Sequence, residues 1–274
     1  NEVYSKEVPV PVVLPVYSGD DNIYEMDPTM QINEFVAYIT DDIVGARDEE
    51  GNAIAVDGNV IVGIPLSANE DDCKKITVYT DNAGYELTVI SYTKIIKTAE
   101  DLEVLKLNDV NDLKRGCYVL GANIDYGGKR FTHFKDLLTN TNYKSGTCGF
   151  SGTFDGRGYT ITNIELGVGG LFGTVNLLAD GGIVRLKNFA VTGVKFQSIW
   201  NVSTLGVAVV GAETWQRYLD LSNVYVQISD FGQITQGGNG ALFRDVIGQW
   251  TKMTNVVIDA AGTPSSAQCG SLFA

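Results

Sequence analysis

The side chains best suited to chemistry are few in this sequence and lie far apart. Asp125, Asp155 and Arg157 come nearest to a catalytic set, because glycoside hydrolysis needs two carboxylates about 5–10 Å apart and a lyase needs a base with a cation. However, the aspartates lie in "NIDYGG" and "FDGRG", glycine-containing sequences that are typical of β-turns. We therefore expect both aspartates to shape turns, and we predict no catalytic residue.

Histidine and cysteine offer little more. His133 is the single histidine, in "KRFTHFKDLL", so no Ser-His-Asp arrangement is visible and we expect it to be packed or at the surface. The four cysteines form no CxxC pair, which excludes a zinc site of the usual spacing. Cys117 and Cys148 could bridge if their strands are neighbours; buried thiols are the alternative.

A calcium ion is the one cofactor that the sequence suggests. Asp41, Asp42, Asp48 and Glu50 lie within "TDDIVGARDEEGN", and calcium prefers hard carboxylate oxygens. The alternative is a solvated acidic surface with no bound ion.

Four aromatic residues are candidates for binding a sugar or a protein partner: Trp200, Trp215, Tyr218 and Trp250. All fall at or near predicted loops, and their rings can stack on a sugar or bury a partner's surface. Packing within the protein itself is the alternative.

The charge distribution excludes some partners. The 274 residues carry a formal charge of −13, and residues 1–94 account for all of it, with 18 acidic and 5 basic side chains. We therefore expect neither nucleic acid nor an anionic membrane surface as a partner. No run of 18 apolar residues predicts a membrane span. Because the sequence begins with Asn1, we expect a processed secreted protein or a trimmed fragment.

Short alternating segments predict strands in the first third of the chain. Residues 1–18 contain "VPVPVVLPVYSG", which favours an extended linker or edge strand, since proline cannot donate to a ladder; such a strand could also pair with another chain. Residues 19–94 contain "EFVAYIT", "AIAV", "NVIVGIPL", "KKITVYT" and "YELTVISYT", separated by "DEEGN" and "DNAGY". This spacing predicts a β-sandwich.

One helix and a repeat organise residues 95–274. The helix is predicted at about 98–113, with Thr98 as its cap and Asp101 completing a capping box. After it, an apolar-x-Asn-apolar pattern recurs at Asn163, Asn188, Asn223 and Asn255, in steps of 25, 35 and 32 residues.

A glycine marker alternates with these asparagines: "GGLF" at Gly169, "GVAV" at Gly206, "GALF" at Gly240 and "GSLF" at Gly270. Two markers in constant order predict a solenoid. We expect its asparagines to lie in one column at a bend, bonding the equivalent amide one coil away. The glycines would permit turns where a Cβ would clash, and the Leu-Phe pairs 171/172, 242/243 and 272/273 would stack.

Both parts resemble known bacterial surface modules. "ARDEEGNAIAVDGNVIV" and "KKITVYTDNAGYELTV" resemble bacterial immunoglobulin-like domains, although Tyr85 stands where that family usually has asparagine. "FSGTFDGRGYTITNI", "GGLFGTV" and "VRLKNFAV" resemble right-handed parallel β-helices with GLUG-type repeats, over roughly residues 96–274. The repeat at 201–215 departs from this pattern.

The expected architecture is all-β: an N-terminal immunoglobulin-like β-sandwich, then a C-terminal right-handed parallel β-helix with a short capping helix. Together with the resemblance, it predicts a non-enzymatic structural or adhesive module of a bacterial cell surface or appendage. Such a module could assemble through its N-terminal strand, with a protein or a glycan as its partner. Two alternatives stay open: a phage virion component, such as a fibre or capsid decoration, and a polysaccharide lyase or hydrolase of the β-helix type.

Overall fold

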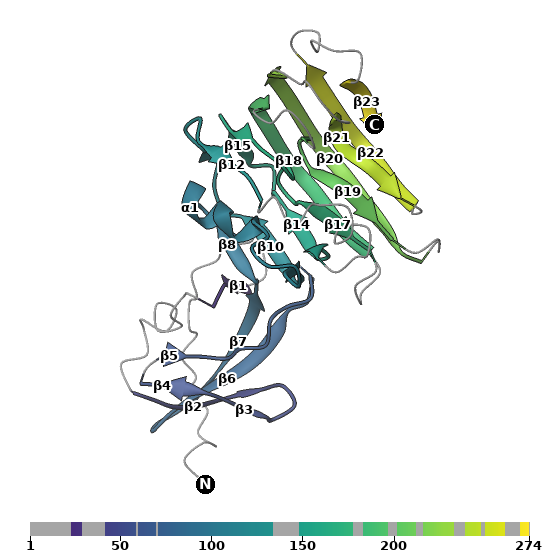
Figure 1. The fold of residues 1–274 in the computed structure, drawn as a ribbon. Helices are drawn as coiled ribbons and strands as arrows, with labels where there is room; N and C mark the ends of the chain where they lie inside the picture. Colours follow the sequence, from purple (N-terminus) through teal and green to yellow (C-terminus); the bar gives the residue numbers. More distant parts are fainter. Residues whose placement is uncertain are drawn as a thin grey trace. The chain divides into compact units, whose positions relative to one another are not determined.

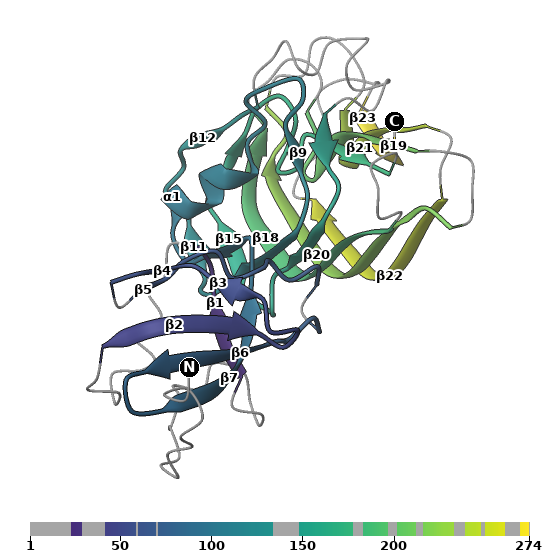
Figure 2. The same ribbon diagram turned by 90° about the horizontal axis from the view of Figure 1, so that it is seen from below.

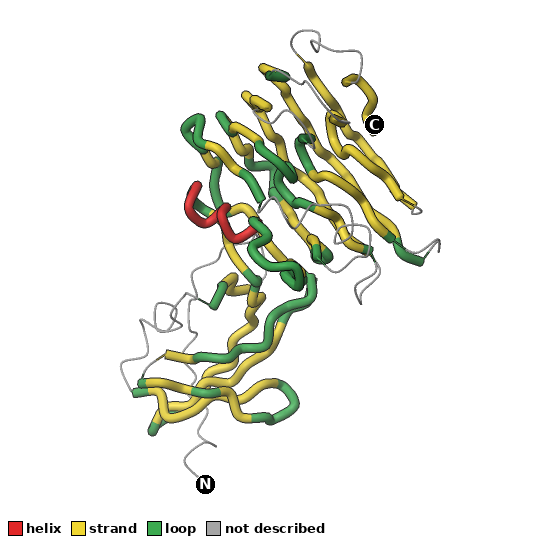
Figure 3. Tube along the Cα trace, viewed as in Figure 1, coloured by secondary structure: helices red, strands yellow, loops and turns green. Residues whose placement is uncertain are grey.

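Over the residues that it describes, the computed structural model is all-β, with 57% strand and one short helix. It describes residues 23–28, 42–58, 60–69, 71–133, 148–177, 183–196, 202–211, 216–232, 239–247, 250–260 and 269–273. Two compact units divide the chain, Asn1–Ile95 and Ile96–Ala274. The predictions of an all-β chain and of a parallel solenoid are confirmed (Figures 1 and 3).

The first unit contains a five-stranded sheet. Its order is β1-β7-β6-β2-β3, in which β1 runs parallel to β7 and the other pairs are antiparallel. The strands are β1 (Ile23–Met26), β2 (Ile43–Asp48), β3 (Ala53–Ile54), β6 (Lys74–Thr80) and β7 (Gly84–Ser91), and β4 (Val56–Asp57) pairs separately with β5 (Val60–Ile61). Alternation buries one side of each long strand, including Ile76, Val78, Leu87 and Val89.

The predicted turns of this unit form the two hairpins β2–β3 and β6–β7. Other expectations, the extended segment 1–18 and the strand "EFVAYIT", lie outside the described residues. Of "NVIVGIPL" only Val60–Ile61 is strand. The described part is a single five-stranded sheet with a small hairpin, so the coarser prediction of a β-rich unit is the one that the structure supports.

The helix is much shorter than predicted. α1 covers Ala99–Leu102 and continues as the 3-10 turn η3 (Glu103–Leu105). The capping box is present as predicted, with Thr98 and Asp101 each accepting from the other's backbone. The helix ends early because the next amides have other acceptors: the N–H of Leu107 donates to the His133 ring and that of Asn108 to the Asp112 carboxylate.

The second unit is a β-solenoid of about three turns, built from two parallel sheets. The first sheet contains β8 (Lys94–Ile96), β10 (Cys117–Leu120), β11 (Ile124–Asp125), β12 (Arg130–Phe131), β14 (Thr153–Asp155), β15 (Thr160–Thr162), β16 (Glu165–Leu166), β18 (Ile183–Phe196), β20 (Tyr218–Asp230) and β22 (Trp250–Ala260). The second contains β9 (Leu113–Lys114), β13 (Gly149–Phe150), β17 (Thr174–Asn176), β19 (Gly206–Val210), β21 (Asn239–Ile247) and β23 (Cys269–Phe273). In Figure 2, β19, β21 and β23 lie opposite β20 and β22.

Successive strands stack in register, so apolar side chains form columns. One column on the first sheet runs Phe154, Leu186, Leu221 and Met253. Phe172 lies among Phe150, Phe154 and Phe189, with ring centroids 5.0, 5.2 and 6.4 Å away. This core forms only when successive turns stack, because a single turn cannot bury its own apolar side chains, as in other repeat architectures.

The asparagines form a hydrogen-bonded column at one bend. The amide Nδ2 of Asn255 donates to Oδ1 of Asn223 (3.0 Å), Asn223 donates to Asn188 (2.9 Å), and Asn188 donates to the carboxylate of Asp155 (3.1 Å). All three asparagines have φ between 52° and 57°, a left-handed conformation that asparagine tolerates better than most residues.

Asn163 belongs to a second column, although the sequence repeat groups it with the other three. Its Nδ2 donates to Asp125 (3.0 Å), and Gly193 takes the equivalent place on the next turn, beside Asn163 Oδ1. The 25 residues from Asn163 to Asn188 therefore separate two different bends. The 35 residues from Asn188 to Asn223 and the 32 from Asn223 to Asn255 each make one full turn of the solenoid.

The glycine markers have a different register from the predicted one. The N–H of Phe172 donates to the carbonyl of Leu205, and the N–H of Leu205 donates to that of Leu242; Ser203 bridges Gly240. Thus "STLG" at 203–206 takes the place of "GGLF", and "GVAV" is the following strand. Phe243 lies opposite Phe273 in register.

The marker glycines occupy restricted positions. Gly169 has φ +100°, and a Cβ on Gly240 would lie 1.8 Å from the Phe243 carbonyl oxygen. Gly270 lies within β23. Cys73, Cys117 and Cys148 form no disulfide.

Candidate functional site

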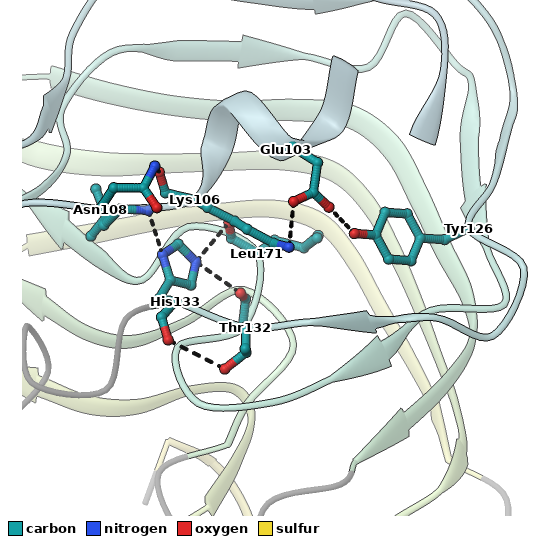
Figure 4. A network of polar contacts seen from close by, with 9 residues as sticks. Glu103, Lys106, Asn108, Tyr126, Thr132, His133 and Leu171 are labelled. Atoms are coloured by element: carbon teal, nitrogen blue, oxygen red, sulfur yellow. Dashed lines mark hydrogen bonds and ion pairs between the residues drawn. The ribbon is translucent and has the colours of Figure 1, made fainter. Parts of the chain in front are cut away.

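A cluster of titratable side chains lies where the chain enters the solenoid (Figure 4). Glu103, on η3, accepts hydrogen bonds from the Tyr126 hydroxyl and from the Lys106 ammonium group. The same ammonium lies 4.9 Å from the centroid of the Phe131 ring, a cation–π geometry. These residue types could transfer protons, so their availability decides whether the cluster is a site.

Both acid–base groups of this cluster are already engaged. Burial alone would raise the pKa of Glu103, but the bonds from Lys106 and Tyr126 prevail and lower it. Burial and the adjacent Glu103 carboxylate raise the pKa of Tyr126. Glu103 is therefore kept deprotonated and Tyr126 protonated, which are the forms that hydrogen-bond to each other. These bonds connect η3 to the first turn of the solenoid. No local sequence pattern indicates this cluster, because its three residues lie up to 23 positions apart.

His133 is buried and fastens two segments together. Its Nδ1 accepts from the N–H of Leu107 (2.9 Å), and its Nε2 lies 3.0 Å from the carbonyl oxygen of Gly170 and 3.2 Å from that of Leu171. These contacts require the neutral tautomer with the proton on Nε2, which donates to the carbonyls. Of the two sequence expectations, packed or at the surface, the structure shows the first.

Acidification is expected to destabilise the fold through His133. Burial lowers the pKa of this ring to about 4, outweighing the carbonyl hydrogen bonds, which favour the charged form. Between pH 6.5 and 4 the unfolded chain therefore binds the proton that the folded chain excludes, so stability falls as the pH falls through this window. From pH 6.5 to 5 we expect a loss of about 2 kcal/mol.

Urea unfolding at pH 6.5, 6.0, 5.5 and 5.0 measures this loss. His133 is the only histidine in the chain, so His133→Gln should be less stable at pH 6.5 and should lose most of the pH slope. An equal slope in both proteins would show that His133 is not the cause.

The aspartates considered for catalysis serve the turns. Asp125 accepts from the N–H of Gly127 (2.9 Å) and from Asn163, and these bonds lower its pKa. Asp155 accepts from the N–H of Arg157 (2.8 Å) and from Asn188, and Lys187 lies 3.6 Å from its other oxygen. The two carboxylates thus start the two asparagine columns, because a carboxylate can only accept.

The acidic segment proposed for calcium is partly described. Asp48 accepts from the N–H of Glu50 (3.0 Å) and from the backbone and side-chain amides of Asn52 (2.7 and 2.9 Å). The Asn52 amide also donates to Glu50, so both carboxylates order the β2–β3 turn. Asp42 is described and exposed, and Asp41 is not described. Within the described ranges, no group of three or more His, Cys, Asp or Glu side chains could hold a metal ion; calcium binding stays a prediction.

The structure brings two of the four aromatic candidates together. Tyr218 and Trp250 begin β20 and β22 and are register partners, whereas Trp200 and Trp215 lie outside the described residues. Two positions further along the same face, Arg185, Asp220 and Lys252 follow one another across three strands, and Lys252 lies 3.8 Å from Asp220. We call this region, with Tyr218 and the three charged residues, the Tyr218 face.

The Tyr218 face is half-exposed and offers both aromatic and charged groups. Tyr218, Arg185 and Asp220 are partly exposed, and Lys252 is exposed. The inward-facing neighbours Leu219 and Leu221 are fully buried, which fixes the outward residues by simple strand alternation. Outward aromatic and charged side chains of this kind can stack against a sugar ring or contact a protein.

Comparison of the chain with protein-family models, with curated proteins and with solved structures gives no match. Among the described residues, no helix is both long and apolar enough to cross a membrane.

Proposed function

We propose that the chain is a non-enzymatic extracellular module with a structural and adhesive role on a bacterial cell surface or appendage. The observation that carries this proposal is that Asp125, Asp155 and His133 all bind parts of their own fold. The Tyr218 face, in contrast, directs aromatic and charged groups outward. A rigid fold whose candidate catalytic groups are bonded within it, and which exposes one polar and aromatic face, suits binding and spacing better than catalysis.

We also propose a family for each of the two units. The N-terminal unit would be an immunoglobulin-like sandwich and the solenoid a right-handed β-helix of GLUG-type repeats, which would follow one another in a secreted chain. Self-assembly through residues 1–18 would link copies into a larger structure.

We further propose that the partner on the Tyr218 face is a glycan or a surface protein, and that the ring of Tyr218 stacks on it. Loss of such a stacking contact weakens binding by roughly ten- to thirtyfold. Tyr225 offers a matched control, because it lies on the same strand, β20, beyond the Asn223 bend, and is also partly exposed.

A glycan array probed with the wild-type chain, Tyr218→Ala and Tyr225→Ala tests this proposal. We expect a glycan signal that Tyr218→Ala loses and Tyr225→Ala keeps. A parallel array in calcium and in EDTA tests the calcium prediction. Release of new sugar ends from any bound polysaccharide would support the enzyme alternative instead, and co-purification with capsids or tails would support a virion component.

A further inference from the structure

The column of polar side chains at the second bend stops one turn after it starts. Asn163 donates through Nδ2 to Asp125 (3.0 Å), and the equivalent residue on the next turn is Gly193, which has no side chain to donate in return. At the corresponding point of the first bend, Asn188 accepts a hydrogen bond from the amide of Asn223 (2.9 Å). The second column therefore lacks a donor that the first column has.

This difference leaves the side-chain oxygen of Asn163 as an open acceptor. The ionised carboxylate of Asp125 can only accept, so the Asn163 amide turns Nδ2 toward Asp125 and Oδ1 away from it. Oδ1 then lies beside Gly193, 3.1 Å from the position that a Cβ on this glycine would take. Among the described residues, no donor bonds to this oxygen.

A hollow of about 170 Å³ lies at the same place. Pockets for drug-sized molecules measure about 300–1,000 Å³, so this hollow suits a single small ring. The glycines of its lining present only backbone atoms, and the other lining side chains are mostly polar. The lining includes Gly127, Gly128, Asn163, Glu165, Gly193 and Lys195.

The two charged residues of the lining offer an acceptor and a donor side by side. Glu165 and Lys195 are register partners on β16 and β18. The Glu165 carboxylate lies 3.7 Å from Nε of Arg130, a contact that leaves it further lone pairs. Lys195 is exposed, and its ammonium group has no ion pair or hydrogen bond among the described residues. Hydroxyl groups both donate and accept, so the hydroxyls of a sugar satisfy this pair.

We propose that the hollow binds an N-acetylated sugar unit. In this arrangement the acetamido N–H donates to Oδ1 of Asn163, as the Asn223 amide does to Asn188 at the first bend. The acetyl methyl group faces the backbone of the glycines, and ring hydroxyls bond to Glu165 and Lys195. The hollow shares no residue with the Tyr218 face, so either site can fail without the other.

Amide NMR of the full chain tests the proposal with two neutral disaccharides. N,N′-diacetylchitobiose carries acetamido groups where cellobiose carries hydroxyls, and the two sugars are otherwise alike. We expect diacetylchitobiose to shift the amide signals of Gly127, Gly128 and Gly193, and cellobiose to bind about tenfold more weakly. No shift of these signals at about 10 mM diacetylchitobiose, which would saturate a millimolar site, would overturn the proposal.

Two further outcomes of the titration would also count against the proposal. Equal affinity for the two disaccharides would show that the acetamido group is not recognised. N-acetylglycinamide binding as tightly as diacetylchitobiose would show that the hollow recognises an amide and not a sugar.

Gly193→Asn should strengthen the fold and abolish the site. Asparagine tolerates the φ of +62° at this position, and its amide would donate to Asn163 and fill the hollow. We therefore expect a higher urea midpoint of unfolding than in the wild type, with no signal shifts on addition of diacetylchitobiose. Unchanged binding in this variant would place the ligand elsewhere.

Lys195→Met provides a second variant, which leaves the bend itself intact. Methionine keeps most of the side-chain length and removes the ammonium group, so binding of diacetylchitobiose should weaken about tenfold. Lys75→Met makes the same change at an exposed lysine of the first unit and should bind the sugar as the wild type does. Equal affinity in the two lysine variants would exclude Lys195 from the site and contradict the proposed arrangement.

Discussion

Replacing Phe172 by alanine is expected to lower the free energy of unfolding of the solenoid by about 3–5 kcal/mol. The side chain is 0% exposed and contacts three other phenylalanine rings contributed by β13, β14 and β18. Truncation would remove apolar contacts from several turns at once, and a packed parallel stack cannot collapse to fill the space.

Equilibrium unfolding in urea, followed by tryptophan fluorescence, measures this loss. All three tryptophans lie between residues 200 and 250, so the signal reports the second unit alone. Phe172→Leu keeps most of the volume and should cost less than about 1.5 kcal/mol. Val257→Ala, at a position that is 49% exposed, should change stability by no more than about 0.5 kcal/mol. Equal losses in all three variants would contradict the position of Phe172 in the core.

Asn223→Ala is expected to lower the free energy of unfolding by about 2–5 kcal/mol, although the residue is exposed. Two causes add. The variant loses the amide bonds to Asn188 and from Asn255, each contributing about 0.5–1.5 kcal/mol. It also places a Cβ-bearing residue at φ +53° without the local bonding that makes asparagine tolerant, which costs about 1–2 kcal/mol.

Asn223→Gly separates the two causes. Glycine adopts positive φ without strain, so this variant should lose only the amide bonds, about 1–3 kcal/mol. The difference between the two variants, from the same urea experiment, is the cost of the left-handed backbone. If both variants were as stable as the wild type, the amide column would have no role in holding the turns together.

Much of the fold was predictable because its physics is local and repeated. Alternation of apolar and polar residues in β18, β20 and β22 specifies which side is buried. Asparagine and glycine mark the bends, because few other residues adopt positive φ. The capping box at Thr98 and Asp101 is likewise a short-range pattern, and it is present.

Elsewhere, contacts between distant residues overrode the local pattern. The helix ends at Leu105 because the amide of Leu107 is bound by His133, 26 positions away. The predicted register of the glycine marker is wrong at Gly206. Both "STLG" and "GVAV" are compatible with a turn or a strand, and only pairing with the neighbouring turns decides which segment takes the marker position. Asn163 falls in another column for the same reason.

By itself, the sequence determined that the chain is all-β and that its second part repeats, because side-chain alternation and turn residues act within a few positions. Only the tertiary structure decided what the polar residues do. Asp125, Asp155, Glu103 and His133 are each capable of chemistry as isolated side chains, yet each is bound by a partner between 23 and 38 positions away. Whether a carboxylate or an imidazole is available depends on which groups surround it, and in a solenoid those groups come from the turns above and below.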